Sequence, residues 1–145
     1  MNYLGIDLGG TNIVAAVVNE KYEIVSEAKN PTLCPRPWEE ILDDVAKTAV
    51  EAANLANLKI SDFAFVGIGS PGVISVETGT VIVAVNLGFE NVPLTKYLSE
   101  KLGVPVILEN DANAAAFGEY KAGKAKNTTN FVALTIGTGI GSGVV

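Results

Sequence analysis

The sequence of 145 residues contains no histidine and a single cysteine, Cys34. One cysteine cannot form a disulfide within the chain, and a zinc site built from cysteine and histidine needs several such ligands at set spacing. The unbroken apolar runs, such as residues 81–85, are far too short to cross a bilayer. No basic segment followed by an apolar run precedes the first predicted strand, which begins within three residues of Met1. We therefore expect a cytoplasmic protein without disulfides, membrane spans or a Cys/His zinc site.

Basic residues are also scarce, because 10 lysines and arginines face 16 acidic residues and give a net charge of −6. Such a chain repels a phosphate backbone, so nucleic acid is not an expected partner. The one basic group, Lys121, Lys124 and Lys126, follows a predicted helix, where cations favour the negative end of the helix dipole. With 48% hydrophobic and 18% charged residues, the composition is that of a compact domain with its own core.

Hydrophobic periodicity predicts the order of the secondary structure. The chain opens with strands over residues 2–8, 13–18 and 22–28, which form an antiparallel meander, and a proline-containing loop over residues 30–37 follows. Further strands are predicted over residues 63–68, 73–74, 80–85, 104–108, 131–136 and 140–145, and helices over residues 38–57, 93–102 and 112–120. Three antiparallel strands followed by α-β-α-β-α crossovers predict an α/β fold with a mixed sheet.

Two segments far apart in the chain are similar to one another, residues 6–14 and residues 135–143. Each consists of an apolar strand, a glycine turn with a threonine, and a second strand, which indicates two related half-domains. We place the first half-domain at residues 1–129 and assign residues 130–145 to the first hairpin of the second. Because the sequence stops within a predicted strand, we expect it to be part of a longer protein.

The first glycine turn follows Asp7 and consists of Gly9, Gly10, Thr11 and Asn12. Two glycines let backbone N–H groups approach an anion closely, and a carboxylate at a strand end can hold Mg²⁺ through water. No Gly-Lys-Ser/Thr follows, so this is not a P-loop, and the turn leads into a strand, unlike the dinucleotide-binding fingerprint. A tight hairpin turn without any ligand explains the glycines equally well.

The second glycine turn contains Gly137, Thr138 and Gly139, with Gly141 and Gly143 beyond it. Glycine weakens a strand unless another group must approach closely, so we favour a phosphate contact here. A third polar cluster, Glu109, Asn110 and Asp111, lies between a predicted strand and a helix, where α/β sheets usually bind ligands. Capping of the helix accounts for one of these residues, although not for all of them.

The chain carries five recognisable segments in a fixed order: GIDLGGTN at residues 5–12, GIGSPG at 67–72, NL and NVPL at 86–87 and 91–94, ENDANA with GE at 109–114 and 118–119, and LTIGTGIG at 134–141. Together they resemble the ROK family of bacterial glucokinases, other sugar kinases and sugar-responsive repressors, and most of all its glucokinase branch. The resemblance covers the whole chain and implies the actin-like ATPase (ribonuclease H-like) fold.

The resemblance implies ATP-dependent phosphorylation of a hexose, with glucose to glucose 6-phosphate as the expected reaction. It implies that Asp7 organises Mg²⁺ through water and that Asp111 is the catalytic base. The ATP phosphates would contact Gly9, Gly10, Thr11 and Asn12 in one loop and Gly137, Thr138 and Gly139 in the other. The sugar would contact Gly72, Asn86, Asn110 and Asp111. A helix N-terminus keeps Asp111 ionised and weakly basic, which suffices because phosphoryl transfer mainly needs the hydroxyl held in line.

One residue departs from the family pattern, since Ser142 stands where the family usually has glycine. The family's cysteine-rich zinc motif, its downstream Glu and His sugar contacts and its adenosine pocket lie beyond residue 145, so we expect the chain alone to be inactive. The alternatives are a sugar- or nucleotide-sensing module without turnover, and a kinase for another sugar such as N-acetylmannosamine or fructose. The family's repressors carry a DNA-binding helix-turn-helix before the first strand, whereas Tyr3 already lies in that strand. The apolar edge of residues 131–145 predicts a homodimer or other self-association.

Overall fold

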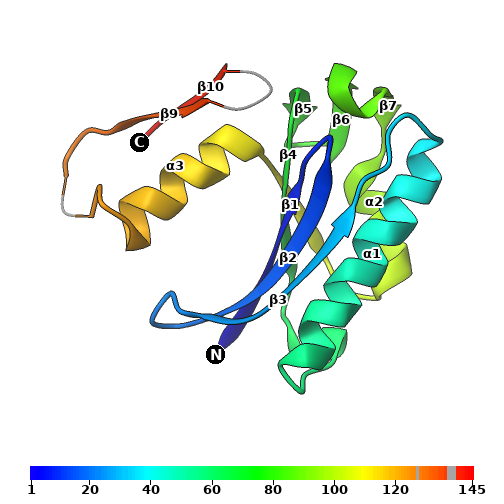
Figure 1. Ribbon diagram of the computed structural model, residues 1–145, viewed down its shortest axis with the longest axis horizontal. Helices are drawn as coiled ribbons and strands as arrows, with labels where there is room; N and C mark the ends of the chain where they lie inside the picture. The colour runs from blue at the N-terminus through cyan, green and yellow to red at the C-terminus, as the bar shows by residue number, and fades with distance from the viewer. Residues whose placement is uncertain (127, 137–139) are drawn as a thin grey trace.

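A mixed five-stranded sheet forms the centre of the computed structural model, which describes residues 1–126, 128–136 and 140–145 (Figure 1). Its strand order is β3-β2-β1-β4-β8, with bounds β1 Asn2–Leu8, β2 Asn12–Asn19, β3 Ile24–Pro31, β4 Val66–Ser70 and β8 Val106–Asn110. The first three strands form the predicted antiparallel meander, whereas β1, β4 and β8 run parallel to one another. The predicted α/β fold with a mixed sheet is therefore confirmed.

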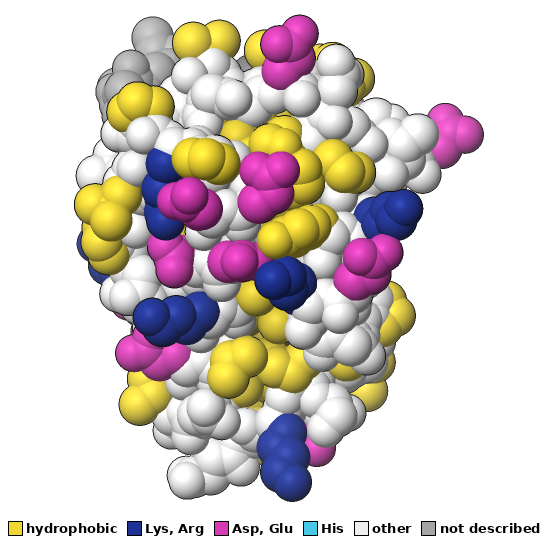
Figure 2. All heavy atoms as spheres, turned by 90° about the vertical axis from the view of Figure 1, so that its right-hand side faces the viewer, with side chains coloured by type: hydrophobic (Ala, Val, Ile, Leu, Met, Phe, Trp, Pro, Cys, Tyr) yellow, Lys and Arg dark blue, Asp and Glu magenta, His cyan; other side chains and the backbone are white. Residues whose placement is uncertain are grey.

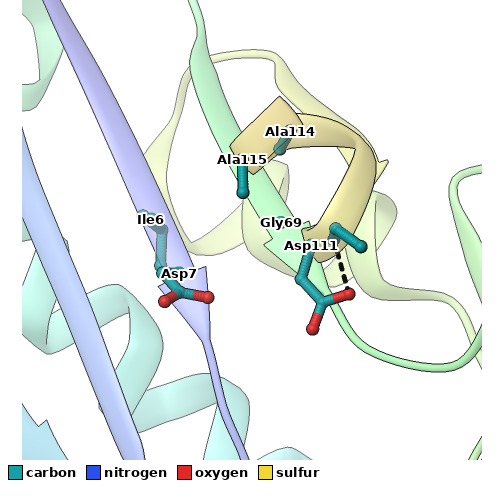
Figure 3. A pocket seen from close by; sticks show the side chains of 7 residues that line it. Ile6, Asp7, Gly69, Asp111, Ala114 and Ala115 are labelled. Atoms are coloured by element: carbon teal, nitrogen blue, oxygen red, sulfur yellow. Dashed lines mark hydrogen bonds between the residues drawn. The ribbon is translucent and has the colours of Figure 1, made fainter. Parts of the chain in front are cut away.

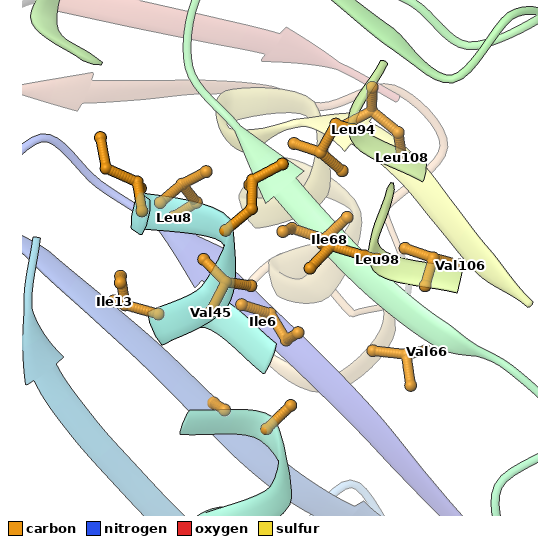
Figure 4. Packing of buried hydrophobic residues seen from close by; sticks show 14 of the residues in the cluster. Ile6, Leu8, Ile13, Val45, Val66, Ile68, Leu94, Leu98, Val106 and Leu108 are labelled. Atoms are coloured by element: carbon orange, nitrogen blue, oxygen red, sulfur yellow. The ribbon is translucent and has the colours of Figure 1, made fainter. Parts of the chain in front are cut away.

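Helices α1 (Trp38–Leu55) and α2 (Leu94–Leu102) cover one face of this sheet (Figure 1). Apolar residues at three- and four-residue steps of α1 are buried against the sheet, and two glutamates occupy its first turn, where the helix dipole favours them. From β1, Leu4, Ile6 and Leu8 point to the same side and are at most 5% exposed. Figure 4 shows Ile6 and Leu8 packed together with residues of β4, β8, α1 and α2. The core therefore lies between the sheet and these helices.

The outer surface of α1 and α2 carries acidic and basic side chains interspersed (Figure 2). Asp43 on α1 pairs with Lys101 on α2 at 2.9 Å and accepts a hydrogen bond from the Tyr97 hydroxyl at 2.8 Å. The Tyr97 ring in turn meets Trp38 edge-on, with centroids 5.2 Å apart. These side-chain contacts connect α1 to α2 on the outer side of the core.

A second, three-stranded sheet consists of β5 (Val73–Ser75), β6 (Thr80–Ala84) and β7 (Phe89–Val92). The β5–β6 hairpin was predicted, but β7 was not, because it is short and half polar. A short 3-10 helix, η2 (Val85–Leu87), precedes it, and Gly88 with φ +68° turns the chain back so that β7 pairs with β6. This small sheet places Asn86 near the end of β1.

Several boundaries differ from the prediction. The third strand begins at Ile24 instead of residue 22, because Tyr22 has φ 64° and belongs to the preceding turn, and it continues to Pro31. The strand predicted from residue 63 is β4, which begins at Val66 after the 3-10 helix η1 (Ile60–Asp62). Both β3 and β4 therefore begin closer than predicted to the edge of the sheet at which β1, β4 and β8 end.

On the opposite side of the sheet lie α3 (Asp111–Ala122) and a separate two-stranded sheet of β9 (Val132–Ile136) and β10 (Ile140–Val144) (Figure 1). Gly143 of β10 lies so close to α3 that an added Cβ would stand 2.5 Å from the Ala116 Cβ, so only glycine fits. Val132, Leu134 and Val144 are 60–76% exposed. Within the described residues, no helix has the length and apolar character needed to cross a membrane.

Candidate active site

A pocket of about 410 Å³ opens where β1 and β4 end and α3 begins (Figure 3). It is lined by Ile6, Asp7, Gly69, Asp111, Ala112, Ala114 and Ala115. The parallel strands bring their carboxyl ends to one edge, with Asp7 beside Gly69 and Ser70 beside Asn110 in the pairing register. Gly69 lets α3 approach, since an added Cβ would already touch the Asp111 Cα at 3.4 Å. The small alanines of α3 leave the space that the pocket occupies.

Two carboxylates, those of Asp7 and Asp111, stand at this pocket (Figure 3). The pKa of Asp7 is raised, first by partial removal of its carboxyl from water and second by the negative charge of Asp111. A cation between or beside the two acids would relieve both effects. Within the described residues no group of three or more potential metal ligands occurs, but Mg²⁺ typically binds one or two carboxylates and fills its remaining positions with water and phosphate oxygens. The Asp7 carboxylate, with the negative charge of Asp111 beside it, therefore fits a Mg²⁺ ion that arrives with a phosphate ligand.

Asn110 caps helix α3, as the sequence allowed. Its side-chain oxygen accepts hydrogen bonds from the N–H groups of Ala112 at 3.0 Å and Asn113 at 3.2 Å. Its amide group donates to the Gly72 carbonyl at 3.3 Å, so the structure brings these two predicted sugar contacts together. Gly72 has φ +93° and packs against β6, which leaves no room for a side chain.

Asp111 is the first residue of α3 and is not needed as its cap. One carboxylate oxygen accepts the Ala112 N–H at 2.8 Å, and the other has no hydrogen-bond partner among the described residues. Asp111 therefore presents a carboxylate oxygen that can accept a hydrogen bond from a ligand.

Glu109 holds this helix start in place, a contact that the sequence did not predict. Its Oε1 accepts hydrogen bonds from the Asn110 N–H at 2.8 Å and from the Asn113 side-chain amide at 3.2 Å. The spacing of Glu109 and Asn113, four residues apart across a helix start, is the only sequence signal for this pair.

The first glycine turn lies beside Asn86. An added Cβ on Gly10 would stand 3.2 Å from the Asn86 carbonyl oxygen and 3.3 Å from its side-chain nitrogen. Within the turn, the Gly9 N–H donates to the Asn12 carbonyl at 2.9 Å, and the Thr11 side chain is exposed. A predicted phosphate loop and a predicted sugar contact are therefore neighbours.

The second glycine turn cannot be placed, since Gly137, Thr138 and Gly139 lie outside the described residues. Its flanking strand β10 packs on the first turns of α3, where an added Cβ on Gly143 would stand 2.7 Å from the Ala112 carbonyl oxygen. The described part of this hairpin thus lies against the helix that begins with Asp111.

The mixed sheet, the glycine turn between its first two strands and the acids at its carboxyl edge are those of the actin-like ATPase fold, as the solved relatives confirm. The chain belongs to the ROK family, whose family model matches residues 3–145.

Similar proteins cover the chain from end to end. A glucokinase from Streptomyces coelicolor is 42% identical over 142 residues, which are 98% of this chain and 43% of that protein. The crystal structure of a ROK glucokinase from Streptomyces griseus in complex with glucose and AMPPNP has a TM-score of 0.89 and 35% identity, over 100% of this chain and 44% of that one. A putative xylose repressor from a Caldicellulosiruptor species is 33% identical over 98% of this chain and 36% of its own length. The chain thus spans less than half the length of these relatives.

Proposed function

We propose that the protein carrying this chain phosphorylates a hexose with ATP, and that its preferred reaction converts glucose to glucose 6-phosphate. The observation that carries the proposal is the placement of Asp7 and Asp111 at one pocket, close to where β1 leads into the turn of Gly9 and Gly10. One acid is available for a phosphate-bound cation and the other for a hydroxyl group. The similarity to glucokinases supports glucose as the substrate.

In the proposed reaction, Asp111 accepts a hydrogen bond from the 6-hydroxyl of the sugar. The hydroxyl oxygen forms a bond to the γ-phosphorus of ATP, the bond to the bridging oxygen breaks, and ADP leaves. The hydroxyl proton passes to Asp111. Since the transition state is loose, the main contribution of Asp111 is to orient the hydroxyl in line with the leaving oxygen. Asn110 and Asn86 would hold the neighbouring hydroxyl groups, together with the backbone at Gly72.

The phosphate groups of ATP would lie against the turn of Gly9, Gly10, Thr11 and Asn12, with Asp7 holding Mg²⁺ through water. The ion would neutralise charge that develops on the phosphate oxygens. We assign the second phosphate contact to Gly137, Thr138 and Gly139, and residues 130–145 to the start of a second half-domain that contains them. The adenosine pocket and the zinc site of the family would lie in the remaining part of the protein, so residues 1–145 alone should be inactive.

Self-association is part of this proposal. Three exposed apolar side chains on β9 and β10, Val132, Leu134 and Val144, favour pairing of this hairpin with further protein. We propose a homodimer for the protein that carries this chain.

A sensing module without turnover is the second candidate, favoured by the similarity to a putative xylose repressor. Such a protein would use the same sugar contacts, but it would release the sugar unchanged. Its ligand-binding residues would be the same as those of the kinase, so only a measurement of turnover separates the two.

The test is an assay of ADP formation by the full-length protein with glucose, mannose, fructose, N-acetylglucosamine and N-acetylmannosamine. We expect the highest kcat/KM with glucose and no turnover without sugar. Calorimetric binding of a sugar without ADP formation for any of them would contradict the kinase and support the sensing module. A preference for another sugar would retain the reaction and correct the substrate.

A further inference from the structure

Thr32, a residue that the proposed reaction does not use, forms hydrogen bonds to the turn of Gly9 to Asn12. This side chain follows β3 and is 0% exposed. Its hydroxyl donates a hydrogen bond to the Gly9 carbonyl at 2.6 Å, and its backbone N–H donates to the Thr11 carbonyl at 2.9 Å. One residue therefore holds two peptide groups of a four-residue turn.

These two contacts determine which way the turn presents its amides. In a trans peptide the C=O of one residue and the N–H of the next point in opposite directions. The Gly9 carbonyl is directed at Thr32, so the Gly10 N–H points away from Thr32. The Thr11 carbonyl is also directed at Thr32, so the Asn12 N–H points away from it as well. The Gly10 N–H has no acceptor among the described residues. A carbonyl held toward Thr32 and a neighbouring N–H group left without an acceptor make an arrangement that can bind an anion.

Thr32 is itself tied to the core. Its carbonyl accepts a hydrogen bond from Arg36 Nε at 2.9 Å, and Arg36 Nη2 forms an ion pair with Asp44 of α1 at 2.6 Å. The side chains of Arg36 and Asp44 are 18% and 35% exposed, so this link is partly shielded from water. The chain of contacts therefore runs from α1 through Arg36 and Thr32 to the turn.

We propose that Thr32 is a positioning residue for ATP, which fixes the Gly9 to Asn12 turn with its amides directed at the phosphates. This role rests on the proposed kinase function. It requires a hydroxyl at position 32, since a methyl group in its place leaves the Gly9 carbonyl without a partner and lets that peptide rotate. Thr32 need not touch ATP, the sugar or the reacting atoms.

The test compares Thr32→Val, which has nearly the same shape without the hydroxyl, with Thr32→Ser, which keeps the hydroxyl. Both are made in the full-length protein. For Thr32→Val we expect the KM for ATP to rise about tenfold, because a buried acceptor has lost its donor. The KM for glucose should change little, and Thr32→Ser should restore most of the ATP affinity.

A matched control is Thr48→Val. Thr48 is equally buried, and its hydroxyl donates to the Asp44 carbonyl within α1 at 2.7 Å and accepts from the Asn30 side-chain amide on β3 at 3.0 Å, but it makes no contact with the turn. This variant should lose stability without a change in the KM for ATP. An equal rise in the KM for ATP in the Thr48 and Thr32 variants would overturn the role of Thr32, as would a Thr32→Ser variant as impaired as Thr32→Val.

Calorimetry with ADP and with AMPPNP supplies a readout independent of turnover. If the wild-type protein binds these nucleotides but transfers no phosphate, the kinase proposal fails, while weaker nucleotide binding by Thr32→Val still supports Thr32. If wild type is an active kinase and Thr32→Val binds nucleotide normally, the role of Thr32 fails alone. Should Thr32→Val not fold, Arg36→Gln tests the same link, and an unchanged nucleotide affinity would contradict it.

Discussion

The two faces of strand β1 differ sharply in what surrounds them. Leu4, Ile6 and Leu8 point into the core and are at most 5% exposed, whereas the alternate residues Tyr3, Gly5 and Asp7 are exposed. Successive side chains of a strand point to opposite faces, so one short segment serves both purposes. We infer that the α1 and α2 face supplies stability, and that the opposite face, with the edge where the strands end, supplies the chemistry. Substitutions on the two sides should therefore separate folding from activity.

The largest effect on activity is expected from Asp111→Ala on the chemical side. It should reduce kcat by about 10²–10⁴-fold, as loss of a general base does, and leave sugar binding nearly intact. Because Asn110 caps the helix, stability should change little. Steady-state kinetics and glucose calorimetry on the full-length protein measure this. Asp43→Ala, which removes an acid from the outer surface of α1, is the control, and unchanged turnover in Asp111→Ala would refute the catalytic role.

A matched pair on β1 tests the comparison by stability. Leu4→Ala leaves a cavity in the core and should cost about 2–5 kcal/mol of the free energy of unfolding. Tyr3→Ala, on the other face at 43% exposure, should cost about 1 kcal/mol or less. Urea denaturation followed by circular dichroism gives both values. Equal losses would mean that the open face contributes as much to folding as the covered one.

Gly10→Ala tests whether the phosphate turn and the sugar contact are coupled. The new methyl group would press on Asn86 at 3.2–3.4 Å, so we expect the KM values for both ATP and glucose to rise about three- to tenfold. Gly67→Ala on β4, where an added Cβ has no neighbour within 4 Å, is the control and should have no effect. A rise in the KM for ATP alone would show that Asn86 adjusts without consequence for the sugar.

The smallest effect is expected from Asp7→Asn on stability, and it depends on pH. Because the pKa of Asp7 is raised in the folded state above 3.8, the folded protein binds this proton more tightly than the unfolded chain does. Ionisation of Asp7 therefore lowers stability as the pH rises through its folded pKa. In the absence of Mg²⁺, Asp7→Asn should be slightly more stable than wild type at neutral pH and lose that advantage below pH 3.8. A variant less stable than wild type at neutral pH would contradict this assignment.

The elements predicted from periodicity were largely confirmed, since helix α1 and the opening meander have long, regular apolar patterns. Strand β7 was not predicted, because it has only four residues, two of them polar, and so shows no clear hydrophobic periodicity. The predicted strand boundaries were wrong where a local backbone conformation set them. The positive φ of Tyr22, for example, places this residue in the turn before β3.

For the candidate site, sequence reasoning found the residues but not the contacts between them. The meeting of Gly10 with Asn86 depends on how the small sheet folds back, and no spacing in the chain predicts that. Thr32 was assigned to a proline-containing loop, because a buried hydroxyl that bonds to a distant carbonyl leaves no periodic signal. The roles of Gly137, Thr138 and Gly139 stay predictions.

The most direct test is a crystal structure of the full-length protein with glucose and AMPPNP. We predict the 6-hydroxyl of glucose within hydrogen-bond distance of the Asp111 carboxylate, with the terminal phosphates against the N–H groups of Gly10 and Asn12. Phosphates bound on another surface, or a glucose whose 6-hydroxyl faces away from Asp111, would contradict it.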